Sequence, residues 1–194
     1  MIYQLTGFIL FLLGCTCRIS KLNELELKAA SRIQTMFNKK PWIGFFQDIW
    51  FLGRTIFAFI IITILIFYDW KIGLAANLIL LLTLAIEKLV KQISNRTRPY
   101  ETAQYILLLQ PAEPTDTSFP SGDTLRIWYL ALIIPVIAGN SPSLLIGLGV
   151  LAMLVSFGRI VMGVHYPADV LAGAGLGTLG AGTTIWIWQL LGLL

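Results

Sequence analysis

The sequence WFLGRTIFAFIIITILIFYDWKIGLAANLILLLTLAIEKLV, residues 50–90, contains two long apolar runs with a short polar interruption around Lys71. A helix of about 20 apolar residues crosses the hydrocarbon layer of a membrane, and a somewhat shorter one suffices where flanking polar side chains reach the interface. The stretch therefore predicts two membrane-spanning helices, near residues 50–68 and 72–90.

The rest of the chain has the same apolar character. Of its 194 residues, 57% are hydrophobic and only 12% are charged, and the mean hydropathy is +0.79. These values are typical of membrane proteins rather than soluble domains. Further apolar runs predict spans near residues 2–17, 124–139, 143–160 and 167–191. We therefore expect an all-α fold, a six-transmembrane helix bundle that forms a single domain over residues 1–194.

The N-terminal residues 2–17 could be a signal peptide or a membrane span. Residues 2–17 have the length of a signal peptide, and LLGC at residues 12–15 loosely resembles a lipoprotein signal, but no basic residue precedes the apolar part. We interpret the segment as a short first span. Residues 19–38 follow it and predict an amphipathic helix in the membrane interface. Its apolar residues recur at helical spacing: Leu22, Leu25, Ala29, Ile33 and Met36.

The formal net charge of +4 does not indicate nucleic-acid binding, because the basic residues are divided among short polar islands between apolar runs. The expected partners are the lipid bilayer and a membrane lipid, with no nucleic acid and no obligate protein partner. Gly175, Gly177 and Gly180 spell G-x-G-x-x-G, but no strand precedes them, so a dinucleotide site is excluded. Gly173, Gly177 and Gly180 instead put small residues on one helix face, where a neighbouring backbone can approach closely.

Three polar clusters are expected on one side of the membrane. The predicted helices end near Val90, begin near Thr124, end near Ile160 and begin near Pro167, so all four ends face the same side. The clusters are KQISNRTRP (residues 91–99), FPSGD (residues 119–123) and GRIVMGVHYPAD (residues 158–169). Their convergence on one surface predicts a binding site there.

Each cluster has a functional and a structural interpretation. Lys91 and Arg98 form a clamp for a tetrahedral oxyanion, or a basic patch that meets lipid headgroups and sets topology. In FPSGD, Ser121 stands at a helix start whose free amides bind anions, although Ser121 or Asp123 can equally act as a helix cap. Arg159 lies at the rim of an apolar bundle, where an unpaired charge is costly.

His165 is the only histidine of the chain. A neutral imidazole can attack phosphorus, and a carboxylate on its other ring nitrogen fixes the tautomer. Asp169 follows four residues later, across the first turn of the last predicted helix, so that the two side chains can meet. The alternative is an interfacial histidine with a structural hydrogen bond.

Together these residues resemble the three-part signature of the type 2 phosphatidic acid phosphatase superfamily, whose soluble relatives are the vanadium haloperoxidases. The motifs are Lys91-x6-Arg98-Pro99, Pro120-Ser121-Gly122 and Arg159-x5-His165-x3-Asp169, and they cover about 80 residues. The resemblance implies that His165 is a nucleophile that forms a phosphohistidine and that Asp169 orients it. It implies that the phosphoryl oxygens contact Lys91, Arg98, Ser121, Gly122 and Arg159. No metal or other cofactor is implied, and the usual substrates are phosphatidic acid, phosphatidylglycerol phosphate, polyprenyl diphosphates and related lipids.

Two positions depart from the family pattern. Gly158 stands where a serine is usual, and Asp123 stands where the family has the histidine that protonates the leaving group. Asp123 is therefore the expected catalytic acid. If it stays ionised, we expect a preference for leaving groups that need little protonation, such as the phosphate released from a diphosphate. The alternative function is a lipid-phosphate-binding membrane protein with weak or no turnover.

The distribution of charge bears on the function and the location of the protein. The charges gather at one rim and no polar path crosses the membrane, which argues against a transporter or channel. We expect a multi-pass protein of a cell membrane, as in the inner membrane of a bacterium. The positive-inside rule would put the site in the cytoplasm, whereas the family resemblance favours the outer side, so the orientation stays open.

Overall fold

The computed structural model describes residues 2–18 and 20–194. The regular structure of this part of the chain is entirely helical, with no strand, which confirms the predicted all-α class. The helices are α1 (Ile2–Gly14), α2 (Ser20–Phe37), α3 (Lys40–Trp50), α4 (Thr55–Tyr68), α5 (Trp70–Ser94), α6 (Pro99–Thr102), α7 (Gly122–Ile137), α8 (Pro142–Val161) and α9 (Pro167–Leu190), with two short 3-10 turns, η1 (Cys15–Arg18) and η2 (Phe51–Gly53).

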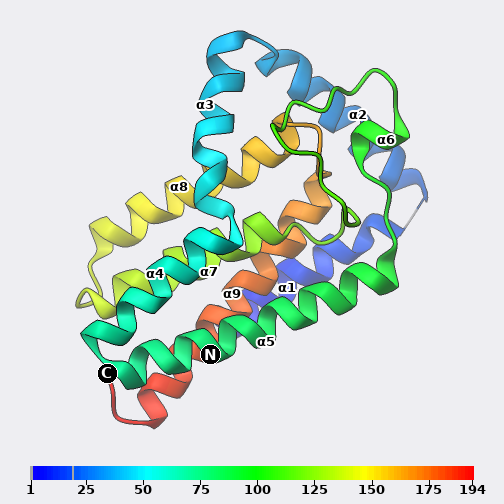
Figure 1. Ribbon diagram of the computed structural model, residues 1–194. Helices are drawn as coiled ribbons and strands as arrows, with labels where there is room; N and C mark the ends of the chain where they lie inside the picture. Colours follow the sequence, from blue (N-terminus) through cyan, green and yellow to red (C-terminus); the bar gives the residue numbers. More distant parts are fainter. Residues whose placement is uncertain (1, 19) are drawn as a thin grey trace.

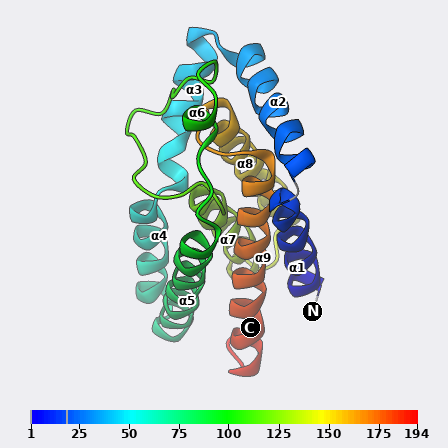
Figure 2. The ribbon, with the colours of Figure 1, turned by 90° about the vertical axis from the view of Figure 1, so that its right-hand side faces the viewer.

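The long helices α1, α4, α5, α7, α8 and α9 form one bundle, and both chain ends lie at the same end of it (Figures 1 and 2). At the opposite end lie α2, α3, α6 and the long connection of residues 103–121. The bundle core is apolar and surrounds α9; Tyr129 of α7 and Trp188 of α9 are its largest fully buried members. Where apolar side chains of this core are removed from water, their burial is the main driving force for packing.

The glycines of α9 allow its neighbours to approach closely, as the sequence predicts. A Cβ atom at Gly173 would overlap the carbonyl oxygen of Ser121, and one at Gly177 would overlap that of Leu125, both in or beside α7. At Gly180 a Cβ would lie 2.7 Å from Oγ1 of Thr83 in α5. The small residues thus fix the distance between α9 and the two helices that carry parts of the cavity described below.

The boundary predicted near residue 50 is wrong. The chain does not continue as one helix from residue 50 to residue 68; it breaks at η2, and Arg54 has an extended backbone with φ −72° and ψ 149°. A tertiary contact holds the break, because Arg126 Nε donates a 2.7 Å hydrogen bond to the Gly53 carbonyl. Helix α3, for which the sequence analysis has no counterpart, precedes the break.

Judged by length and composition alone, fewer helices qualify as membrane crossings than the six predicted. Three helical segments of the described residues qualify as spans: Trp70–Thr102, Pro142–Val161 and Pro167–Leu190. The pair Lys40–Gly53 and Thr55–Tyr68, bent by 46°, adds a fourth if it is counted as one crossing. Helix α1 is apolar but has only 13 residues, and α7 has 16. The six-span count therefore stays a prediction.

Helix α2 (Ser20–Phe37) coincides with the predicted amphipathic helix, residues 19–38, except that it ends one residue earlier and that residue 19 lies outside the described residues. Its packed face is formed by Ala30, which is buried against Ile106 and Ile160, and by the neighbouring Leu27 and Ile33. Leu25 and Met36, from the predicted apolar stripe, are 60% and 70% exposed. The helix is thus apolar on two sides, one against the protein and one facing outward.

Candidate active site

Backbone hydrogen bonds join the three predicted polar clusters at one end of the bundle. Ser118 N donates to Arg96 O at 2.8 Å, and Tyr100 N donates to Gly163 O at 3.2 Å. Ser121 N, at the start of α7, donates to Asp169 O at 3.0 Å. Segments that are up to 63 residues apart in the sequence are therefore held side by side.

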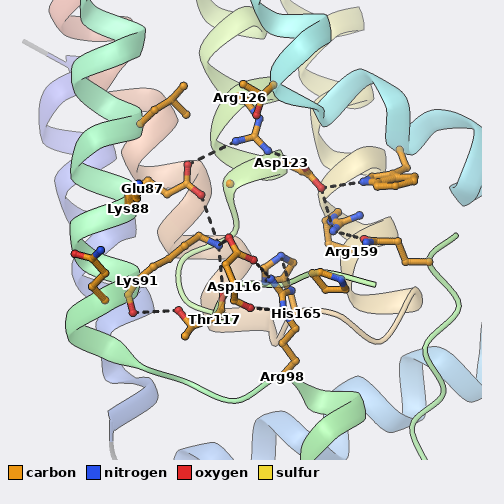
Figure 3. Close-up of a pocket in the computed structure, with 17 residues that line it drawn as sticks. Glu87, Lys88, Lys91, Arg98, Asp116, Thr117, Asp123, Arg126, Arg159 and His165 are labelled. Atoms are coloured by element: carbon orange, nitrogen blue, oxygen red, sulfur yellow. Dashed lines mark hydrogen bonds and ion pairs between the residues drawn. The ribbon is translucent and has the colours of Figure 1, made fainter. Parts of the chain in front are cut away.

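Between these segments lies a cavity of about 640 Å³ (Figure 3). Its wall is formed by the C-terminal end of α5, the start of α7, the end of α8, the end of α3 at Trp50, the start of α4 at Thr55 and the connection of residues 103–121. Its charged members are the cations Lys88, Lys91, Arg98, Arg126 and Arg159 and the carboxylates Glu87, Asp116 and Asp123. His165 also lines the cavity, which carries an excess of positive charge suited to an anion.

His165 lies in the loop between α8 and α9 and is only 3% exposed. Its Nε2 atom is 3.5 Å from Arg98 Nη1, and its Nδ1 atom is 3.6 Å from Asp169 Oδ2, longer than a good hydrogen bond. Burial lowers the pKa of His165 to about 3; Asp169 opposes this shift, and the positive charges of Arg98 and Arg159 add to it. The imidazole is therefore neutral at physiological pH, as a nucleophile requires.

The carboxylate of Asp169 is fully buried and is held by donors from three segments. Arg96 Nη1 lies 2.5 Å from Oδ1, Ser118 Oγ donates to Oδ2, and Tyr166 N donates to Oδ2 at 2.9 Å. Arg96 also stacks on the Tyr166 ring, with Cζ 3.8 Å from its centroid. These contacts fix Asp169 beside His165, across the first turn of α9.

Arg96 connects this pair to helix α2. Its Nη2 atom lies 2.6 Å from Glu26 Oε2, and the other oxygen of Glu26 accepts a 2.6 Å hydrogen bond from Ala168 N at the start of α9. The chain Glu26–Arg96–Asp169–His165 thus runs from the amphipathic helix to the cavity. In the sequence, Arg96 is only a member of the basic cluster, and no spacing signal relates it to Asp169.

Lys91 and Arg98, the two cations of the first motif, share one carboxylate. Asp116 places Oδ2 at 2.9 Å from Lys91 Nζ and Oδ1 at 2.6 Å from Arg98 Nη2. Although burial opposes the charge, Lys91 and Arg98 lower the pKa of Asp116. Arg98 is further fixed by the Val164 carbonyl, 2.8 Å from Nη1. The two cations are therefore arranged around one anionic group, and a phosphoryl group would compete with Asp116 for them.

Arg159 of α8 is buried, and its Nη2 atom lies 2.9 Å from Asp123 Oδ2 and 2.5 Å from Gln110 Oε1. Its Nε and Nη1 atoms have no hydrogen-bond partner in the part of the chain that the structure describes. Buried N–H groups in proteins are nearly always paired. A phosphoryl oxygen would satisfy these two donors.

Of the second motif, Pro120-Ser121-Gly122, only Gly122 lines the cavity. Gly122 lines the cavity at the first turn of α7. Ser121 is fully buried, its Oγ atom lies 3.0 Å from Thr124 Oγ1, and its amide is bonded to Asp169 O. Its side chain is not a helix cap, so that alternative is wrong for Ser121.

Asp123 is held by three donors. Arg126 Nη2 lies 2.5 Å from Oδ1, and Arg159 Nη2 and Trp50 Nε1 lie 2.9 Å and 3.0 Å from Oδ2. Gly53 makes room for it, since a Cβ there would lie 2.8 Å from Cβ of Asp123. Asp123 therefore links α3, η2, α7 and α8 as an ionised carboxylate.

Five charged residues of this site are additional to those predicted. Glu87, Lys88 and Arg126 lie inside the predicted spans of residues 72–90 and 124–139, and an ionisable residue in a span is itself a signal of function. Asp116 and Arg96 carry no such signal. The other departure, Gly158, has a packing reason, because a serine Cβ there would lie 2.8 Å from the ring of Phe46 in α3.

Among residues 2–18 and 20–194, no group of three or more His, Cys, Asp and Glu side chains is arranged to hold a metal ion. The arrangement instead combines a neutral imidazole, a carboxylate behind it and several cations around a common space. Chemically, these groups can bind a tetrahedral oxyanion and attack its central atom.

The neutral state of His165 gives a direct prediction. Because the pKa is lowered to about 3, the imidazole should stay neutral from pH 8 to pH 5. Specific ¹⁵N labelling of histidine yields a single imidazole spectrum, since the chain has one histidine. The ring shifts should not change over this range, whereas the unfolded protein should titrate near 6.5. A folded-state midpoint near 6.5 would contradict the assigned burial.

Fold and site together define an all-helical protein with membrane-type helices and an oxyanion cavity that contains a histidine–aspartate pair. The chain belongs to the PAP2 superfamily, whose sequence profile matches residues 72–192. It is 34% identical over 109 residues to an undecaprenyl-diphosphatase of Sulfolobus acidocaldarius, an alignment that covers 56% of this chain and 51% of the relative. The chain thus spans about half the length of that protein.

A sequence comparison and a structural comparison, both with Bacillus subtilis phosphatases, cover most of each chain. The chain is 28% identical over 179 residues to phosphatidylglycerophosphatase B, covering 84% of this chain and 82% of the relative. The crystal structure of a transmembrane PAP2-type phosphatidylglycerolphosphate phosphatase superposes with a TM-score of 0.83, at 24% identity and over 97% of both chains. The second comparison establishes the fold.

Proposed function

We propose that the protein is a metal-independent lipid phosphate phosphatase that acts through a phosphohistidine intermediate. The observation that carries this proposal is the position of His165, which lines the cationic cavity. Its Nε2 atom lies near Arg98, and its Nδ1 atom faces the buried carboxylate of Asp169. Membership of the PAP2 superfamily and the phosphatase names of the relatives support it.

The residues have separate roles in this mechanism. His165 Nε2 attacks phosphorus, and Asp169 stabilises the positive charge that develops on the ring. Lys91, Arg98 and Arg159 neutralise the phosphoryl oxygens, with the first turn of α7 at Gly122 as a further anion contact. Ser121 would join them after rotation of its hydroxyl away from Thr124. Water then hydrolyses the phosphohistidine.

Asp123 has a different role from the one its position in the motif suggests. With donors on both oxygens, we assign it as an ionised anchor that positions Arg159 and Arg126. The alternative function, a binding protein without turnover, was based on the absence of the family's acid at this position. It is not favoured, because the nucleophile, its carboxylate and the phosphate-binding cations lie together.

We further propose that all six long helices cross a cell membrane and form a single domain over residues 1–194. Helices α1 and α7 are short for a span, but both pack on the buried helix α9, and flanking polar residues can reach the interface. The exposed leucine and methionine side chains of α2 would then rest on the bilayer. A lipid headgroup would enter the cavity sideways while its tails stay in the membrane.

The substrate class follows from the shape and charge of the cavity. A phosphomonoester or diphosphate headgroup fits the cations, and the relatives' names point to phosphatidylglycerol phosphate or polyprenyl diphosphate, with phosphatidic acid as a third candidate. The test is phosphate release in detergent from these three lipids, with and without EDTA. We expect turnover of at least one lipid, unchanged by EDTA. No release from any of them would refute the proposed function.

Helix α2 should influence catalysis through Glu26, which is a positioning residue. Glu26→Gln removes one charged partner of Arg96, and a hydrogen bond to a charged group contributes about 1.5 kcal/mol, so kcat should fall about tenfold. KM should stay constant, because Glu26 does not line the cavity. Glu24→Gln, on the exposed face of α2, is the matched control. A loss in both variants, or a change confined to KM, would contradict this role.

A further inference from the structure

The carboxylate at position 123 is poorly placed to supply a proton. Both of its oxygens accept from cationic or indole donors at 2.5 Å to 3.0 Å. A protonated oxygen would face a donor instead of an acceptor, and would leave a buried arginine without its partner. The leaving group of a phosphomonoester nevertheless needs a proton, so another acid must face the cavity.

Glu87 is the other buried acid of the cavity. It extends from α5, one turn before Lys91, and is 7% exposed. Its Oε1 atom lies 3.6 Å from Lys91 Nζ and its Oε2 atom 3.6 Å from Arg126 Nη1, and no hydrogen bond to its carboxyl group is found in the described part of the chain. Unlike Asp123, it therefore retains capacity to hold and donate a proton.

The carboxyl group of Glu87 lies beside Gly122 of the second motif. A Cβ atom at Gly122 would overlap Glu87 Oε1 and would lie 2.9 Å from Arg126 Nη1. The carboxyl group is thus against the first turn of α7, which belongs to the phosphate-binding motif. Figure 3 shows Glu87 extending from α5 toward α7, on the same side of the cavity as Arg126 and away from His165.

Binding of a phosphorylated substrate would change the electrostatic surroundings of Glu87. Lys91 and Arg126 are its nearest cations, and Asp116 and Asp123 are the acids bonded to them. A phosphoryl group bound by Lys91, Arg98 and Arg159 competes with Glu87 for Lys91 and adds negative charge to the cavity that the carboxyl group faces. Both effects favour the neutral acid in the complex.

We infer that Glu87 is the general acid and base of this protein, in place of the residue at position 123; the inference rests on the proposed phosphatase function. As the His165 nitrogen bonds to phosphorus, the bond from phosphorus to the leaving oxygen breaks and its electron pair takes the proton of Glu87. The Glu87 carboxylate then removes a proton from the attacking water as its oxygen bonds to phosphorus and the phosphorus–nitrogen bond breaks. Phosphate leaves, and Glu87 is protonated again.

The test uses two amphiphilic phosphomonoesters with the same alkyl chain, one an alkyl phosphate and the other a nitrophenyl phosphate whose ring carries the chain. Nitrophenolate departs without protonation, so a missing acid affects only the alkyl ester. In rapid-quench measurements, Glu87→Gln should phosphorylate His165 from the alkyl ester 10² to 10⁴ times more slowly, within about the range for general acid catalysis. The burst from the nitrophenyl ester should change less than about tenfold.

Control variants separate a chemical role from a structural one. Glu87→Asp, which keeps a carboxyl group, should recover part of the rate with the alkyl ester, and the exposed Glu24→Gln should behave as wild type. Asp123→Asn should slow both esters equally. An equal loss from both esters in Glu87→Gln, or no loss, would overturn the role of Glu87. Failure of the wild-type protein to form phosphohistidine from either ester would instead refute the proposed function and, with it, this inference.

Discussion

His165→Ala should abolish phosphate release, with a loss of about 10⁴- to 10⁶-fold, as for removal of other enzyme nucleophiles. No other imidazole is available, because the chain contains one histidine. The cations around the cavity would remain, so the variant should still bind a phosphate analogue. Acid-quenched samples from labelled lipid phosphate should contain acid-labile, base-stable protein phosphate in the wild type and none in the variant.

The structural effect of this substitution should be small. Within the described residues, His165 Nδ1 has no hydrogen-bond partner, so its removal leaves no strong polar contact broken. Asp169 retains Arg96, Ser118 and the Tyr166 amide. Binding of inorganic phosphate with unchanged affinity would show that the cavity is intact. Phosphate release at the wild-type rate would mean that His165 is not the nucleophile.

Those parts of the molecule that depend on local sequence can be predicted from it. The long apolar runs place α5, α8 and α9 within a few residues of the predicted spans, because hydrophobic length alone determines them. The directions of the helix ends near Val90, Thr124, Ile160 and Pro167 then bring the three motifs to one end of the bundle. The glycine face of α9 is likewise a local pattern with a direct packing consequence.

Features that depend on tertiary contacts cannot be predicted in this way. The break between α3 and α4 lies in a run that is apolar enough for one helix, and it is held by Arg126 from a distant segment. The pairing of Asp116 with Lys91 and Arg98 depends on the path of a long connection with no periodic pattern. The sequence shows which charged residues a motif contains. Only the fold shows which of these charges are already paired with an opposite charge from another segment.

Asp123 shows the same limit most clearly and leads to the second large effect. Asp123→Asn should lower the free energy of unfolding by about 3–5 kcal/mol, the range for removal of one partner of a buried ion pair. The reason is that Arg126 and Arg159 are both buried and both lose the carboxylate closest to them, which leaves Arg126 with Glu87 at 3.6 Å. The change should also loosen the turn at η2, because Trp50 and Gly53 contact Asp123 or its partner Arg126. Reversible unfolding in mixed micelles measures this difference.

The matched control is Asp48→Asn, which removes an exposed carboxylate from α3 and should change stability by less than about 0.5 kcal/mol. Asp123→His, which introduces the usual residue of the family, should destabilise at least as much as Asp123→Asn. An imidazole has at most one acceptor nitrogen and cannot satisfy two arginines. A histidine variant as stable as the wild type would show that Arg126 and Arg159 do not depend on the carboxylate. If the prediction holds, Asp123 and Arg126 function as a pair in this chain. A histidine at position 123, the usual residue of the family, would then require a change of Arg126 as well.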